Sequence, residues 1–212
     1  MATLYTVANK GAPLTPTEAD YNMALLNIRT GEGWDDLVAP MEIQTGSPDA
    51  PTLTEWMDGM FLPEFNNSND LAVLGKFHVN HRYKLGTMMY PHLHFSPSDD
   101  AASGVVRLGF RYKVARRHDS TGQVKFTSAV TLIREFNIPL NSAGTHFVVE
   151  MPQGEGIPST HLEPDVMILM ETFRFGSHVN DTFTGSIWCM THDLHYELDR
   201  DATINRAPNF YA

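Results

Sequence analysis

The chain has 212 residues, 42% of them hydrophobic, a single cysteine (Cys189) and a formal net charge of −10. This charge argues against wrapping nucleic acid, since phosphate binding needs a basic face. No apolar stretch reaches the roughly 20 residues that cross a bilayer. One cysteine allows no disulfide within the chain, which fits a reducing compartment. We therefore expect a soluble protein with no direct nucleic-acid partner and no membrane partner.

Residues 1–65 are rich in prolines and glycines, which prevent long regular elements. Only one short helix is predicted there, with Thr15 as its N-cap and a capping box completed by Glu18. The rest of 1–65 is predicted to be an irregular, extended N-terminal arm. Trp34 and Trp56 must pack against something, because large apolar side chains are unfavourable in water.

We expect this arm to lie across a neighbouring subunit. Ordering such a chain costs conformational entropy, which buried anchors must offset. The candidate anchors are large apolar side chains of the arm: Leu14, Tyr21, Leu25, Trp34 and Trp56. An arm that wraps its own domain is the alternative.

Residues 66–212 show the alternation of apolar and polar residues that is typical of half-buried strands. In 104–115 the residues predicted to face the core are Val106, Leu108, Phe110, Tyr112 and Val114. The other candidate strands are 71–79, 88–95, 123–136, 145–151, 166–175 and 186–199, separated by turn-rich segments. This pattern predicts an all-β domain, a jelly-roll-like antiparallel β-sandwich at 66–212.

The last candidate strand, 186–199, alternates throughout. Its pattern predicts Trp188, Met190 and His192 on the apolar face and Cys189 on the polar face. We therefore expect His192 to be a core histidine with one hydrogen bond satisfied. Cys189 has no evident histidine partner and is expected to be an inert thiol.

Two histidines, His92 and His94, lie two apart in GTMMYPHLHFS and share a strand face, as two ligands of one metal ion can. The spacing G-x5-H-x-H also resembles the first metal motif of cupins, which are β-sandwich metalloproteins. Where the cupin pattern has a glutamate, this chain has Asp99 and Asp100 in the following loop.

The ligand set is incomplete, because no second cupin motif follows. His192 or His195 could supply a third ligand, but His192 is predicted to face the core. We therefore predict no metal and no cofactor, with a cupin-like metal-dependent enzyme as the alternative.

Basic residues crowd into 107–125, whereas 150–199 is acidic. Such asymmetry can dock one copy of a chain against another or against a neighbour. The predicted partner-binding cations are Arg107, Arg111, Arg116 and Arg117. Two solvated faces without a partner are the alternative.

Several motifs resemble those of bacteriophage proteins. The segment KGAPLTPTEADYN (10–22) resembles one that often opens tailed-bacteriophage virion proteins. G-W-D-D-L (33–37), the stretch 81–95 that ends in P-H-L-H-F, and H-Y-E-L-D (195–199) resemble, in order and spacing, a group of small phage structural proteins. The resemblance implies a jelly-roll-like sandwich attached to a shell or tail.

The expected function is therefore a capsid cement or decoration protein, without enzymatic activity, that stabilises the shell by bridging neighbouring subunits of a virion assembled in the host cytoplasm. Its expected partners are copies of itself, as a trimer, and the major capsid protein or another virion protein. A tail, collar or head-fibre component is one alternative. A sugar-binding module, with Tyr83, Tyr90 or Phe95 lining a groove, is another.

Overall fold

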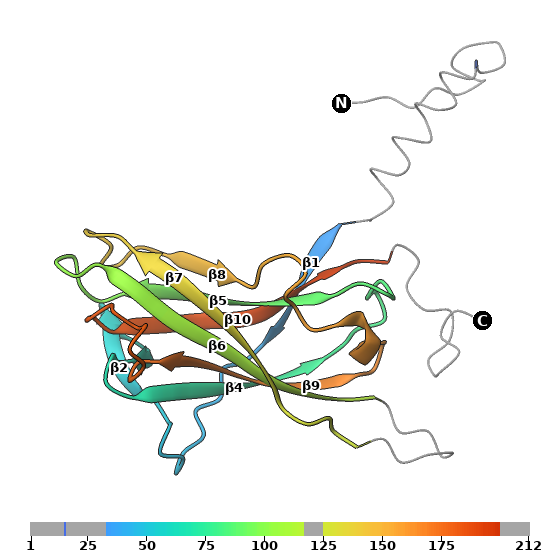
Figure 1. Ribbon diagram of the computed structural model, residues 1–212, viewed down its shortest axis with the longest axis horizontal. Helices are drawn as coiled ribbons and strands as arrows, with labels where there is room; N and C mark the ends of the chain where they lie inside the picture. The colour runs from blue at the N-terminus through green and yellow to red at the C-terminus, as the bar shows by residue number, and fades with distance from the viewer. Residues whose placement is uncertain (1–14, 16–32, 117–124, 200–212) are drawn as a thin grey trace.

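The computed structural model describes residues 15, 33–116 and 125–199, which form two antiparallel sheets packed face to face (Figure 1). One sheet has the order β2-β3-β10-β5-β8, with β1 beside β10, and the other has the order β4-β9-β6-β7. This confirms the predicted antiparallel β-sandwich. The strands are β1 (Trp34–Ala39), β2 (Thr52–Met57), β3 (Met60–Phe65), β4 (Asp70–His78), β5 (Met89–Pro97), β6 (Gly104–Ala115), β7 (Val130–Ile138), β8 (Phe147–Glu150), β9 (Met167–Phe175) and β10 (Ile187–Glu197).

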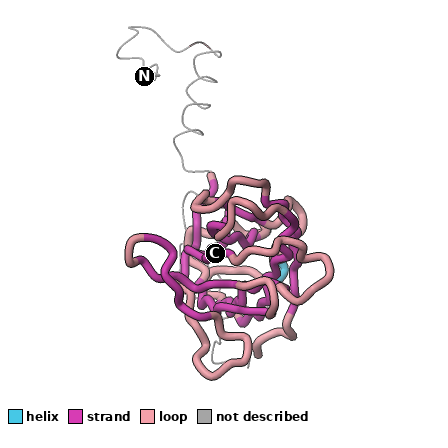
Figure 2. Tube along the Cα trace, turned by 90° about the vertical axis from the view of Figure 1, so that its left-hand side faces the viewer, coloured by secondary structure: helices cyan, strands magenta, loops and turns pink. Residues whose placement is uncertain are grey.

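Loops and a single helical turn, η1 (Ser159–His161), complete the described ranges (Figure 2). No helix in these ranges is long and apolar enough to cross a bilayer. The seven strands predicted from alternation correspond to β4–β10, and β6 has the predicted bounds. All five side chains of β6 that were predicted to face the core are buried there.

Residues 34–65 correct the predicted division of the chain. They contribute β1, β2 and β3 to the six-stranded sheet, so the prediction of an irregular arm over 1–65 is wrong for this part. β1 pairs along its whole length with β10, and β3 pairs with the beginning of β10. This segment therefore packs on its own domain, as the alternative held. The predicted helix and its candidate anchors Leu14, Tyr21 and Leu25 lie outside the described residues.

A two-residue turn explains why β2 and β3 form. Asp58 and Gly59 have φ angles of 46° and 81°, and they connect Met57 to its cross-strand partner Met60. Two consecutive positive φ angles are the requirement of a type I′ hairpin turn, which Asp-Gly satisfies readily. Pro51 precedes β2 and Pro63 lies within β3, opposite Leu53, and neither prevents strand formation here.

A bulge in β10 corrects the predicted faces of that strand. The register shifts between Cys189 and Thr191, so one residue is inserted into the alternation. Cys189 is fully buried in the core, and Trp188 instead donates a hydrogen bond from Nε1 to Thr54 Oγ1 on the opposite face (2.8 Å). Burial raises the pKa of the Cys189 thiol, so it is an unreactive core residue.

The core prediction for His192 is confirmed. The residue is fully buried, and its Nδ1 lies 2.9 Å from Thr172 Oγ1 on the facing sheet. Burial lowers the pKa of His192 to about 4, so its imidazole is neutral at physiological pH.

Arg174 of β9 is a fully buried cation at one end of the sandwich. It forms a bidentate ion pair with Asp181, from Nε to Oδ2 (2.9 Å) and from an Nη to Oδ1 (2.7 Å). Its remaining N–H groups donate to the carbonyl oxygens of Phe65, Gly185 and Phe183. All five guanidinium donors are thereby used, which fixes the loop before β10 to both sheets.

Candidate functional site

Imidazoles and carboxylates gather on the outer face of the six-stranded sheet, opposite the core. Strand alternation turns His92 and His94 of β5 outward, and the antiparallel register places His92 directly between Asp193 of β10 and Glu150 of β8. His195 lies opposite Asp36 of β1 in the same way. We call this cluster the histidine face; it comprises Asp36, His92, His94, His146, Glu150, Asp193 and His195.

The inner part of the histidine face is a buried carboxylate between two imidazoles. His92 Nε2 lies 2.6 Å from Asp193 Oδ1, and His94 Nε2 lies 3.7 Å from the same oxygen. The side chains of His92 and Asp193 are only 1% and 5% exposed. Despite the short contacts, Asp193 Oδ1 has no hydrogen-bond partner of acceptable geometry among the described residues.

The outer part is a histidine held between two carboxylates. His195 Nε2 lies 2.7 Å from Asp36 Oδ1, and His195 Nδ1 lies 2.7 Å from Glu150 Oε1. Each ring nitrogen of His195 therefore has a carboxylate oxygen at hydrogen-bonding distance. The ring of His195 lies 4.2 Å from that of His92, which joins the two parts.

The two histidines of β5 differ in proton affinity. Burial acts to lower the pKa of His92, but Asp193, Asp36 and Glu150 together outweigh it, and the pKa is raised. Burial lowers the pKa of His94, and the neighbouring imidazoles lower it further against the pull of Asp193. His94 also stacks on His146, with 2.8 Å between Nδ1 of His94 and Nε2 of His146.

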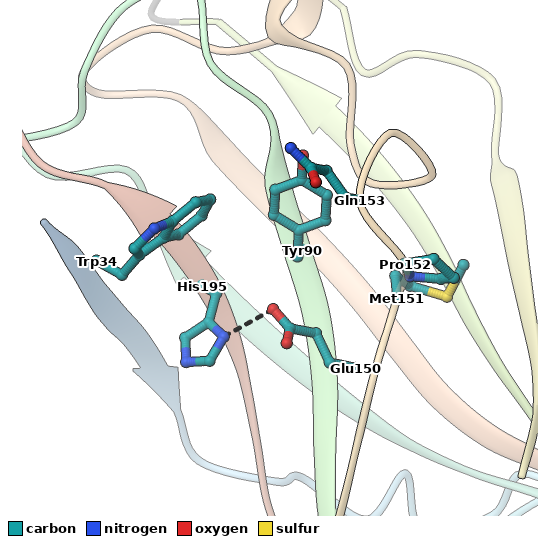
Figure 3. Close-up of a pocket in the computed structure, with 7 residues that line it drawn as sticks. All are labelled: Trp34, Tyr90, Glu150, Met151, Pro152, Gln153 and His195. Carbon is teal, nitrogen blue, oxygen red and sulfur yellow. Dashed lines mark hydrogen bonds and ion pairs between the residues drawn. The ribbon is translucent and has the colours of Figure 1, made fainter.

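An open hollow of about 620 Å³ adjoins the histidine face. Figure 3 shows Trp34 and His195 on one side of the hollow, Tyr90 in its middle with Gln153 beside it, and Met151 and Pro152 on the other side. The Trp34 and Tyr90 rings lie 5.7 Å apart and are tilted by 57°. The hollow thus combines two aromatic rings with a carboxylate, an amide and an imidazole.

The structure places the predicted metal-ligand candidates differently from the cupin pattern. His92 and His94 do share a face, but Asp99 and Asp100 accept backbone hydrogen bonds from Ala101 and Ala143 in loops instead. His192 faces the core, so it cannot join them.

Asp193 is the residue that sequence reasoning missed. It lies next to His192 in the chain, yet it points to the opposite face and contacts His92. Its place in the polar alternation of β10 was visible, but the cross-strand pairing with His92 was not.

The three aromatic residues predicted to line a sugar-binding groove differ in exposure. Tyr83 and Phe95 are fully buried, which removes them from any groove. Tyr90 lines the hollow, together with Trp34, which is 56% exposed. Trp56, the second predicted anchor on a strand, is half-buried in β2.

The predicted partner-binding cations lie on and beside the four-stranded sheet and have acidic neighbours within the chain. Arg107 pairs with Glu135, Arg111 with Glu171 (2.5 Å) and Arg116 with Glu163 (3.6 Å). Arg117 lies outside the described residues. These pairs reduce the net charge that the basic stretch offers to a partner, and its role in docking stays a prediction.

Comparison with known proteins yields no matching family model and no matching curated protein. Several solved structures are similar in fold. One is a family 11 carbohydrate-binding module from Clostridium thermocellum in complex with a β-1,3-1,4-mixed-linked tetrasaccharide, with 9% identity, coverage of 77% of this chain and 96% of that chain, and a TM-score of 0.34. Another is TmCBM61 in complex with β-1,4-galactotriose, with 10% identity, coverage of 80% and 92%, and a TM-score of 0.26.

A third is CBM28, a carbohydrate-binding module specific for non-crystalline cellulose, with 14% identity, coverage of 78% and 85%, and a TM-score of 0.27. Similarity at this level concerns the general arrangement of a β-sandwich and does not extend to ligand or function.

Proposed function

We propose that this chain is a non-catalytic structural protein of a bacteriophage particle that attaches to a neighbouring subunit of the shell and reinforces it. The motifs at 10–22, 33–37, 81–95 and 195–199 suggest the class of protein. The observation that carries the proposal is an exposed apolar hairpin at the edge of the six-stranded sheet.

The hairpin β2–β3 presents four large apolar side chains to solvent. Leu53 is 53% exposed, Met57 41%, Met60 53% and Phe61 59%. Exposed large apolar side chains concentrated on one short hairpin favour an interaction site there. β2 is also the edge strand of its sheet. The bulge between Glu55 and Met57 interrupts its pairing with β3, and bulges of this kind discourage a further strand from pairing with an edge.

The mechanism is the burial of this surface between subunits. A standard protein interface buries about 1,600 Å² in total. Repeated over a shell, such contacts would resist internal pressure by adding area that must be exposed before subunits separate. A trimer of this chain would present three hairpins to the shell and gain from their simultaneous binding.

The test uses particles from which this protein has been stripped. Wild-type chain added back should restore the temperature at which the particles release DNA, whereas Phe61→Ser should not. Trp34→Ala, which alters an exposed aromatic residue elsewhere, should restore it like the wild type. Unchanged DNA release after stripping would contradict cementing, and an image placing the protein on the tail or collar would favour that alternative.

The hollow favours a second function, carbohydrate binding. Aromatic rings pack against the apolar faces of sugar rings, and a few convergent polar groups then select orientation. Trp34 and Tyr90 supply the rings, and Gln153 and Glu150 supply hydrogen-bonding groups. On a particle, this surface would bind glycans of the host cell.

A glycan array followed by calorimetry tests this function. Trp34→Ala should abolish binding of any glycan found, and Phe61→Ser should leave it unchanged. Retained affinity in Trp34→Ala, or no ligand among the glycans, would refute this use of the hollow.

A further inference from the structure

We propose that His92, His94 and Asp193 bind one divalent transition-metal ion of the zinc class. This site lies on the histidine face beside the hollow and is independent of the proposed attachment through β2–β3. Each of the three residues offers one ligand atom within 4.8 Å of the other two, and the contacts with Asp193 Oδ1 indicate Nε2 of both histidines.

The spacing of these atoms suits a single small ion. Zinc binds imidazole nitrogen and carboxylate oxygen at about 2.0–2.2 Å, so a tetrahedral site places neighbouring ligand atoms roughly 3.3 Å apart. The observed separations from Asp193 Oδ1 are 2.6 Å to His92 and 3.7 Å to His94, on either side of that value. Small side-chain rotations would equalise them.

The second argument is the unsatisfied oxygen of Asp193. This side chain is 5% exposed, and its Oδ1 lies 2.6 Å from His92 Nε2, close enough for an ion pair but without the alignment of a good hydrogen bond. A buried carboxylate oxygen without a partner is unfavourable. A cation coordinated at that oxygen and at both Nε2 atoms removes the deficit.

Two sets of residues could hold the ion, and the contacts of His195 distinguish between them. Asp36, His92 and His195 also bring three ligand atoms together. However, both ring nitrogens of His195 already lie 2.7 Å from a carboxylate oxygen. In the other set, His94 Nε2 lies 3.7 Å from Asp193 Oδ1, which is beyond hydrogen-bonding distance, so we assign the ion there.

The donor set selects the class of metal. Two imidazoles and one carboxylate suit zinc, nickel, cobalt or iron, whereas calcium and magnesium prefer oxygen ligands throughout. A water molecule would supply the remaining ligand. Nδ1 of His92 has no hydrogen-bond acceptor in the described part of the chain, and a missing outer partner typically weakens binding 10- to 100-fold. We therefore expect micromolar rather than nanomolar affinity for zinc.

The test is calorimetric titration of the full, metal-free chain with zinc chloride. The wild type should bind one ion per chain. Affinity should fall at least about tenfold in His94→Gln and in Asp193→Asn, because each removes a ligand. His178→Gln is the matched control, since it removes an exposed imidazole from a distant loop, and it should bind like the wild type.

Cobalt provides a second readout. Substituted cobalt should give visible d–d absorption bands typical of nitrogen and oxygen ligands, and Asp193→Asn should lose them while circular dichroism confirms its fold. Asp36→Asn should keep zinc affinity within about threefold of the wild type, as expected for a residue outside the ligand set. Absence of stoichiometric zinc binding would overturn the proposal, as would loss of binding in Asp36→Asn with retention in Asp193→Asn.

Discussion

Two buried charged sites of this sandwich contrast in how their polar atoms are satisfied. At one end, Arg174 and Asp181 are both fully buried, and every guanidinium donor has an acceptor. On the histidine face, Asp193 is nearly as buried as Asp181, but its Oδ1 lacks an aligned donor. The first site makes all of its hydrogen bonds within the chain, whereas at the second we propose an added cation.

The difference separates a structural role from a binding role. A buried ion pair whose hydrogen bonds are all made fixes loops and strands in place. A buried carboxylate oxygen whose nearest donor is poorly aligned calls for a separate explanation, and a bound ion is one such explanation. The predictions below test whether the two sites respond to substitution as this distinction requires.

The largest loss of stability is expected at the buried ion pair of Arg174 and Asp181. Arg174→Met should lower the free energy of unfolding by about 3–5 kcal/mol, because Asp181 is left buried and unpaired. Urea unfolding followed by tryptophan fluorescence measures it. Arg111→Met is the control, since its partly exposed pair with Glu171 should contribute less than about 1 kcal/mol. Equal losses in the two variants would mean that burial of Arg174 has no energetic consequence.

A smaller loss of stability is expected at Gly75 of β4, which packs against His192 in the core. A Cβ at Gly75 of β4 would lie inside the van der Waals contact of the His192 imidazole and of Phe77. Gly75→Ala should therefore cost about 1–3 kcal/mol of unfolding free energy through overpacking. Its zinc affinity should nevertheless stay within about threefold of the wild type, because His192 belongs to the core and not to the ligand set. Calorimetric titration of the folded variant measures its zinc affinity. A loss of zinc binding would show that packing around His192 in the core affects the metal site.

The smallest effect is expected at Asp193 in the presence of a chelator. Asp193→Asn should change the unfolding free energy by less than about 1 kcal/mol, because the lost attraction to His92 is offset by removing a poorly satisfied buried charge. The same urea experiment measures it. A loss as large as that of Arg174→Met would instead identify Asp193 as the anion of an ordinary structural ion pair.

The regular part of the fold could be predicted because its strands alternate with period two. In β6 the inward side chains at 106, 108, 110, 112 and 114 alternate with Arg107, Gly109, Arg111 and Lys113, and the predicted bounds and inward face are those observed. β2 and β3 were missed because Pro51 before β2 and Pro63 within β3 were weighted above Asp58-Gly59, which is a strong local signal for a hairpin. The faces of Trp188 and Cys189 were inverted because a bulge adds a residue without leaving a mark in the sequence pattern.

Only the two histidines of the proposed metal site could be predicted from the sequence. His92 and His94 are neighbours on one strand, so local spacing brings them together. Asp193 lies about 100 positions away and meets them only through the pairing of β5 with β10. Register between distant strands depends on packing and on the bulge, and neither can be derived from the local pattern of one strand.

The most direct test of the metal site is a double comparison of stability. Urea unfolding is measured for the wild type and for Asp193→Asn, each with a chelator and with zinc at about 100 times its dissociation constant. Zinc should stabilise the wild type by about 2.7 kcal/mol and leave Asp193→Asn almost unchanged. Equal stabilisation of both proteins, or none of either, would contradict a metal site formed by His92, His94 and Asp193.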